Sequence, residues 1–305
     1  MLHVKRKSFS IHIRILLSAT FFFCQFSAPL CAQNSKLKVA AQQIEKMIQS
    51  SGAEVSVAFR TLDGKSEWFY RADDSVHAAS TMKIPVMIEL FHQVREGKIK
   101  LDQPLEIKNE FHSIVDGSVF SLNAKDDSET DLYHADGQTR TLSELCELMI
   151  TVSSNFATDL VIEKLGPANV QATVQAMKAD GVKVLRGVED QKAYDKGLNN
   201  TTTARGLLAL MDAIGKGKAV DAGASKQMIE ILERQKFNEG IPAGLPANIK
   251  VAHKTGELSK INHDAAIVFA PRPYVLVVLV RGLEDFKQSS ALIASISRQL
   301  YQVSQ

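Results

Sequence analysis

The sequence is poor in cysteine and tryptophan, with three cysteines and one tryptophan among 305 residues. It contains no glycine-rich phosphate loop and no histidine spacing typical of metal ligands, which argues against a nucleotide-binding protein and a metallo-hydrolase. No internal repeat and no low-complexity linker is present. We therefore expect a globular protein that needs neither a metal nor another cofactor.

An excess of charge of one sign is also missing. The 36 basic and 34 acidic residues give a formal net charge of +2. Four of the basic residues lie near the N-terminus, namely Lys5, Arg6, Lys7 and Arg14. They precede the apolar run 15–26 and the small-residue cleavage site Leu30-Cys31-Ala32, so we predict a signal peptide over residues 1–32. Its removal leaves 273 residues with a formal charge of −2, and nothing in this balance points to a nucleic-acid partner.

The apolar run near the N-terminus is shorter than the roughly 20 residues of a membrane span. We therefore expect export to the periplasm or the medium, with a retained anchor as the alternative. Cys24 and Cys31 would leave with the signal peptide. Cys146 then remains alone in an apolar helical pattern, so no intramolecular disulfide is expected and Cys146 is interpreted as a core residue.

The order of hydrophobic patterns predicts the fold class. Apolar residues recur at helical spacing between Leu37 and Ile48 and again between Leu292 and Leu300. Five runs read as strands, the first two joined by an Asp-Gly turn: 53–62, 66–70, 249–253, 261–270 and 274–280. We expect an α/β (α+β) fold, in which an antiparallel sheet of about five strands is flanked by N- and C-terminal helices. An inserted all-helical lobe, roughly 80–245, completes a single catalytic domain over 33–305, with a cleft between lobe and sheet.

Ser80-Thr81-Met82-Lys83 matches the pattern S-x-x-K. Pro85 fits only in the first turn of the apolar helix that follows, which places Ser80 at the helix start, where free N–H groups favour negative charge. Lys83 lies on the same face, and its desolvated amine could accept the Ser80 proton. Taken alone, the pattern fits an N-cap serine and a surface lysine equally well. A second match, at Ser35, lies in a polar segment at the new N-terminus and is set aside.

Ser153-Ser154-Asn155 matches S-x-N between two amphipathic helical patterns, 142–152 and 156–165. A tight turn between packed helices can aim side chains into a cleft. We therefore predict Ser153 as the proton relay to a leaving nitrogen and Asn155 as an amide donor to the substrate, although an ordinary helix-joining turn would look the same. A second match, Ser121-Leu122-Asn123, lies in the polar stretch 110–137.

Lys254-Thr255-Gly256 follows His253 and lies between strand-like runs. Lys254 and Thr255 could hold a carboxylate, and Gly256 would let a substrate lie along the strand edge. The backbone N–H of Glu257, paired with that of Ser80, could form an oxyanion hole.

In this order the three motifs are the S-x-x-K, S-x-N and K-T-G elements of penicillin-interactive serine hydrolases. With the segments Leu148–Val152 and Thr201–Thr203 added, almost the whole mature chain resembles the class A β-lactamases and their relatives among penicillin-binding D-alanyl-D-alanine peptidases. The resemblance implies an acyl-enzyme on Ser80 and a β-lactam or D-alanyl peptide as substrate. We expect a monomer.

The chain departs from the family pattern at three points. The relay turn usually carries Asp in its middle, where this chain has Ser154. The family's Ω-loop pattern Glu-x-x-Leu-Asn is missing from the loop 181–201. The most similar segment there has Asp195 three residues before Leu-Asn, with Asp where the pattern has Glu. Glu189 is the candidate water-activating base, with an ion pair to Arg186 as the alternative. The cation that helps to hold the substrate carboxylate has three candidates: His263, Lys260 and Arg281.

Three functions follow from these observations. The leading one is an exported serine hydrolase that opens β-lactam rings through Ser80, as class A β-lactamases do. The main rival is a D-alanyl-D-alanine carboxypeptidase that β-lactams acylate and that deacylates slowly. A catalytically silent cell-wall binding protein on the same fold is the third, and penicillins would not label its Ser80.

Overall fold

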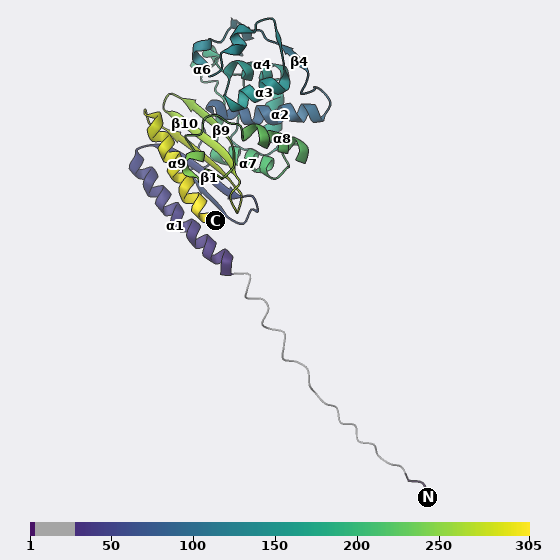
Figure 1. The fold of residues 1–305 in the computed structure, drawn as a ribbon, viewed down its shortest axis with the longest axis vertical. Helices are drawn as coiled ribbons and strands as arrows, with labels where there is room; N and C mark the ends of the chain where they lie inside the picture. The colour runs from purple at the N-terminus through teal and green to yellow at the C-terminus, as the bar shows by residue number, and fades with distance from the viewer. Residues whose placement is uncertain (4–27) are drawn as a thin grey trace.

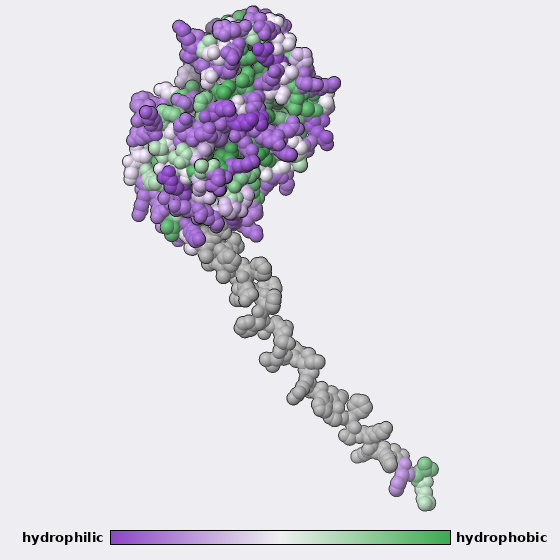
Figure 2. All heavy atoms as spheres, in the orientation of Figure 1, coloured by the Kyte–Doolittle hydropathy of each residue, from purple (hydrophilic) through white to green (hydrophobic). Residues whose placement is uncertain are grey.

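The computed structural model describes residues 1–3 and 28–305 (Figure 1). The segment 4–27, which holds most of the predicted signal peptide, lies outside the described residues. No helix in the described ranges is long and apolar enough to cross a membrane. The face shown in Figure 2 is mostly hydrophilic, with hydrophobic residues in separate patches.

A five-stranded antiparallel sheet is assembled from both ends of the chain, as the sequence predicts. Its strand order is β2-β1-β11-β10-β9. The strands are β1 (Glu54–Thr61), β2 (Glu67–Tyr70), β9 (Val251–Leu258), β10 (Ile261–Val268) and β11 (Tyr274–Arg281). Strand β9 is five residues longer at its C-terminal end than the predicted run 249–253, so the K-T-G motif lies inside an edge strand.

The sheet is buried on both faces. Alternate residues of β11 point to opposite sides: Leu276 and Val278 join one hydrophobic core, while Val275 and Val277 join the other. The first core lies beneath the terminal helices α1 (Ala28–Ser51) and α9 (Phe286–Val303), which pack side by side on one face (Figure 1). Helix α7 (Ala204–Gly215) packs on the other face. Burial on both faces explains why β11 is a nearly continuous apolar run.

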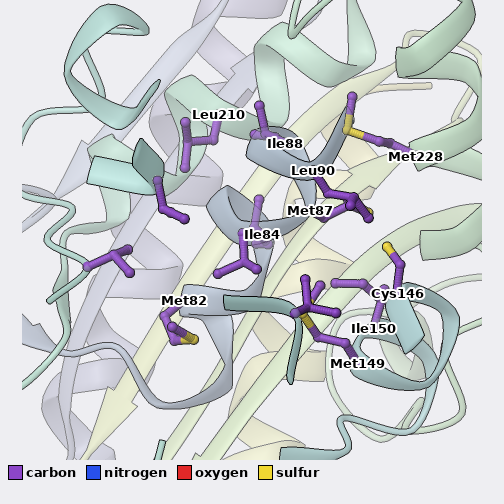
Figure 3. Packing of buried hydrophobic residues seen from close by; sticks show 14 of the residues in the cluster. Met82, Ile84, Met87, Ile88, Leu90, Cys146, Met149, Ile150, Leu210 and Met228 are labelled. Carbon is purple, nitrogen blue, oxygen red and sulfur yellow. The ribbon is translucent and has the colours of Figure 1, made fainter. Parts of the chain in front are cut away.

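The inserted lobe is mainly helical and is built around α2. Its helices are α2 (Lys83–Arg95), α3 (Leu142–Thr151), α4 (Asn155–Leu165), α5 (Pro167–Ala176), α6 (Gln191–Asp195) and α8 (Ala222–Leu232). Figure 3 shows Met87 and Leu90 of α2 packed with Cys146 of α3 and Met228 of α8. Cys146 is therefore a core residue, as predicted, and burial raises the pKa of its thiol to about 12.

The lobe also contains short irregular elements that helical periodicity does not reveal. Three two-stranded pairs are present, β3 (Val76–His77) with β8 (Thr201–Thr202), β4 (Pro104–Glu106) with β7 (Thr139–Thr141), and β5 (Phe111–His112) with β6 (Val119–Phe120). Four 3-10 turns accompany them: η1 (Ala79–Met82), η2 (Ala124–Asp126), η3 (Asp131–His134) and η4 (Pro242–Gly244). Parts of the polar stretch 110–137 fold this way, because its Asp, Asn, Ser and Gly residues favour turns.

Candidate active site

Ser80 lies in η1, directly before α2, at the position that the sequence predicts. Pro85 is the third residue of α2, within its first turn. Ala79, just before Ser80, has a left-handed φ of 45°, a conformation that non-glycine residues rarely adopt and that is often found at functional sites. Ser80 lines two adjoining cavities of about 540 and 580 Å³, which also share Asn155 and Glu257. The serine hydroxyl thus belongs to a cleft large enough for a small-molecule substrate.

The side chain of Lys83, three residues after Ser80, is fully buried. Its ammonium donates hydrogen bonds to the Ser153 backbone oxygen at 2.7 Å, to Asn155 Oδ1 at 2.9 Å and to Ser153 Oγ at 3.2 Å. Burial lowers the pKa of Lys83 to about 7, although nearby carboxylates, Asp127 first among them, oppose the shift. A large fraction of the amine is therefore neutral near pH 7, as a general base must be.

The second lysine of the site, Lys254, is also fully buried. Its ammonium donates to Ser153 Oγ at 2.9 Å and to the Thr255 backbone oxygen at 2.8 Å. Burial, together with the charge of Lys83, holds the pKa of Lys254 well below its usual range. One serine hydroxyl therefore lies between two buried amines, where it can relay a proton. Ser153 itself has a left-handed φ of 59°.

The K-T-G glycine packs closely against the serine turn. A Cβ added to Gly256 would lie 3.1 Å from the backbone nitrogens of Ser80 and Thr81, closer than most real Cβ contacts. Glycine at position 256 therefore lets strand β9 approach the start of α2 without crowding, a reason different from the substrate space that the sequence suggested. The approach brings strand β9 next to the Ser80 N–H, which lies in a first helical turn, where backbone N–H groups lack intrahelical acceptors.

Asn155 connects the two candidate catalytic bases. Its Nδ2 donates to Glu189 Oε1 at 2.8 Å, while its Oδ1 accepts the bond from Lys83. Glu189 has a left-handed φ of 60°. Partial desolvation raises the pKa of Glu189, the Asn155 hydrogen bond opposes this, and the charges of Asp126 and Asp127 add to it. Asn155 is thus committed to protein partners on both sides of its amide, in addition to any contact with substrate.

The alternative ion pair between Arg186 and Glu189 is not formed. Arg186 is buried and donates to the backbone oxygens of Leu198 at 3.0 Å and Gly187 at 3.1 Å, so its guanidinium holds the loop together. Asp195 accepts a hydrogen bond from Gln191 at 2.7 Å and lines neither of the Ser80 cavities.

Asp159 of α4 places this loop, and sequence analysis missed it. It is buried, and its Oδ1 accepts the Val188 N–H at 2.6 Å. A Cβ on Gly187 would lie 2.2 Å from the same oxygen. Burial raises the pKa of the Asp159 carboxyl well above its usual range. An isolated aspartate in a helical pattern carries no local sign of such a role.

None of the three candidate cations lines a cavity that contains Ser80. His263 is buried against the His77 backbone oxygen at 3.1 Å, and burial lowers its pKa to about 4, so it is neutral at pH 7. Lys260 pairs with Glu284 and Arg281 with Glu54, both at 2.6 Å. Lys125 does line the second cavity, together with Ser80. Within the described ranges, no group of acidic, histidine or cysteine side chains could hold a metal ion.

A five-stranded sheet and a mainly helical lobe meet beside the cleft that Ser80 lines, with Lys83, Ser153 and Lys254 joined by hydrogen bonds next to it. The family model described as the Beta-lactamase enzyme family matches residues 39–304, and the chain belongs to this family. The extended-spectrum β-lactamase PER-1 of Pseudomonas aeruginosa is 24% identical over 304 residues, 94% of each chain. The β-lactamase CTX-M-97 of Escherichia coli is 27% identical over 258 residues, 83% of each chain.

A solved structure titled PBP-A is also similar. It has 28% sequence identity and a TM-score of 0.75, and the match covers 87% of this chain and 96% of that one. A mutant of PBP-A has been solved as an acyl-enzyme complex with penicillin G. The resemblance and the fold class predicted from the sequence are thus confirmed.

Proposed function

We propose that this protein is an exported serine hydrolase that opens β-lactam rings through an acyl-enzyme on Ser80. The observation that carries the proposal is the position of the Ser153 hydroxyl, within hydrogen-bonding distance of both Lys83 and Lys254 beside a cleft that Ser80 lines. A nucleophile next to an amine of lowered pKa, with a second hydroxyl to carry the proton onward, is what acyl transfer to a lactam requires.

In the proposed acylation step, each group has one role. Neutral Lys83 accepts the Ser80 proton as the hydroxyl attacks the lactam carbonyl. The N–H groups of Ser80 and Glu257 stabilise the oxyanion. Ser153 passes its proton to the departing nitrogen and is reprotonated by the amines that flank it. Thr255, which lines the second cavity, and the charge of Lys254 hold the substrate carboxylate.

Deacylation needs a base for water, and Glu189 is our candidate. It lines the first cavity with Ser80 and is held by Asn155. Its raised pKa suits a group that takes a proton and then releases it. Hydrolysis of the Ser80 ester then frees the enzyme, a turnover that would support antibiotic resistance.

A second function, D-alanyl-D-alanine carboxypeptidase, is favoured by one specific observation. Glu189 stands in an unusual loop without the Glu-x-x-Leu-Asn arrangement, and its carboxylate is bonded to Asn155. A base held in this way could activate water poorly, so that the ester with a β-lactam accumulates. The similarity to PBP-A fits this second reading as well.

Intact-mass spectrometry during turnover of a chromogenic cephalosporin tests the proposal. A transient adduct on Ser80 with continuing colour release supports the lactamase, and a long-lived adduct supports the carboxypeptidase. Ser80→Ala should abolish both signals. An adduct that maps to Ser35 or Ser153 would refute the assignment of the nucleophile, and no adduct with any penicillin would indicate a silent binding protein. Detection of the cleaved N-terminus after Ala32 in secreted material would support export.

A further inference from the structure

A carboxylate from a distant segment is bonded to the turn that carries Ser153 and Asn155. Asp127 follows η2 in the polar stretch 110–137. Its Oδ2 accepts hydrogen bonds from the Phe156 N–H at 2.9 Å, from the Tyr133 hydroxyl at 3.0 Å and from the Ser154 hydroxyl at 3.3 Å. Three donors on one oxygen indicate a carboxylate built into the structure.

The same segment is attached to the turn at other points. The hydroxyl of Ser128 donates to the Val152 backbone oxygen at 2.5 Å. The rings of Tyr133 and Phe156 lie with their centroids 4.8 Å apart. Because Asp127 holds the residue after Ser153 and Ser128 holds the residue before it, the relay serine is fixed from both sides.

Ser153 needs such support because its left-handed φ of 59° costs free energy in a residue other than glycine. A relaxed turn would move both Ser153 Oγ and Asn155 Oδ1, and these are two of the acceptors around Lys83. The position of the Lys83 amine therefore depends on the geometry of this turn.

We propose that Asp127 is a positioning residue of the acyl-transfer site, which holds Ser153 and Asn155 against Lys83 through its bonds to Ser154 and Phe156. The inference rests on the proposed function, because the consequence measured is the rate of acylation of Ser80. Asp127 acts through the turn and is not itself assigned a contact with the reacting atoms.

The charge of Asp127 gives the role a second, independent consequence. The charged groups that act on Lys83 are Asp127, Asp159, Glu189 and Lys254. Of the carboxylates, Asp127 opposes the lowering of the Lys83 pKa most strongly. Loss of its charge should lower the Lys83 pKa further, so the pH at which acylation is half-maximal should fall. A residue with only a structural role would leave that pH unchanged.

The test compares penicillin acylation of wild type, Asp127→Ala, Asp127→Asn and Asp131→Asn across the neutral pH range, with thermal unfolding as a check on folding. Asp131→Asn is the matched control, since Asp131 lies in the same polar stretch, is exposed and lines neither of the Ser80 cavities. Asp127→Ala should slow acylation about 10- to 100-fold, as expected for loss of hydrogen bonds to a charged group. Asp127→Asn should shift the half-maximal pH downward. Asp131→Asn should change the rate by no more than about twofold.

A compensating variant separates positioning from general damage. Ser154 Oγ lies 3.3 Å from the Asp127 carboxylate, so Asp in place of Ser154 would bring a carboxylate to the same place from within the turn. Ser154→Asp alone should slow acylation, because the new carboxylate would lie against the Asp127 carboxylate and the two like charges would repel each other. Combined with Asp127→Ala, it should recover about tenfold of the lost rate, a coupling typical of groups in contact.

Folded Asp127→Ala that acylates at the wild-type rate would overturn the inference, as would an equal loss in Asp131→Asn. If Asp127→Ala does not fold, Asp127→Asn decides: an unchanged rate and an unchanged half-maximal pH refute the role. These outcomes are distinct from failure of the proposed function, which would show as wild-type protein that penicillin never labels.

Discussion

The Lys254 ammonium donates a hydrogen bond to the Ser153 hydroxyl at 2.9 Å, although the two residues lie 101 positions apart in the sequence. This bond joins the edge strand of the sheet to the turn between α3 and α4. It also places Lys254 behind Ser153, so that its charge acts on the cleft through that hydroxyl.

Acylation of Ser80 should depend on pH through Lys83. The neutral amine is the base, so the rate should be low below the Lys83 pKa of about 7, rise as pH passes through that value and level off above it. Lys83→Ala should lower the rate about 10²- to 10⁴-fold, the usual contribution of a positioned general base. Stopped-flow labelling with penicillin measures both effects. Near-normal labelling of Lys83→Ala would exclude Lys83 as the base.

Lys254→Ala should weaken the reaction with β-lactams that carry a free carboxylate more than with matched ester analogues. The reason is that the lost charge attracts the anion, whereas the ester offers no charge to attract. Steady-state kcat/KM for both substrates provides the comparison, with the exposed Lys226→Ala in α8 as control. Equal losses for acid and ester would show that Lys254 mainly orders Ser153.

Glu189→Gln should leave acylation intact and slow deacylation, giving a burst followed by slow release. Glutamine keeps an oxygen for the Asn155 amide but cannot accept a proton from water. Quenched-flow mass spectrometry follows the ester directly. Asp195→Asn, in the same loop but outside the Ser80 cavities, should behave like wild type. Identical ester lifetimes in Glu189→Gln and wild type would remove Glu189 from the mechanism.

Gly256→Ala should destabilise the protein and impair acylation together. Its methyl group would meet the Ser80 and Thr81 backbone nitrogens at 3.1 Å, so strand β9 or the serine turn must shift. Overpacking of this kind costs about 1–3 kcal/mol. Thermal unfolding and penicillin labelling report the two effects. Gly223→Ala in α8, where the new methyl meets one carboxylate oxygen at 3.3 Å, is the control. An active and equally stable Gly256→Ala would contradict the close approach described for β9.

Much of the fold could be predicted from the sequence because its determinants are local. Helical and strand periodicity reports which side of each element is buried, and this located the five sheet strands and both terminal helices. Pro85 located the start of α2 in the same way, since a proline is confined to the first turn. The short strands between 104 and 141 were not predicted, because elements of two or three residues are too short to show a hydrophobic periodicity.

The sequence by itself also supplied the candidate groups of the site, namely Ser80, Lys83 and the two later motifs, because each motif is a short run of defined spacing. Only the tertiary structure decided how these groups are held. Asp159 and Asp127 contact the site from segments with no recognisable motif. The Arg186 guanidinium donates to backbone oxygens and does not form the alternative ion pair with Glu189. The lowered Lys83 pKa has the same origin. Burial and hydrogen bonds arise between residues distant in sequence, so they exist only once the chain has folded.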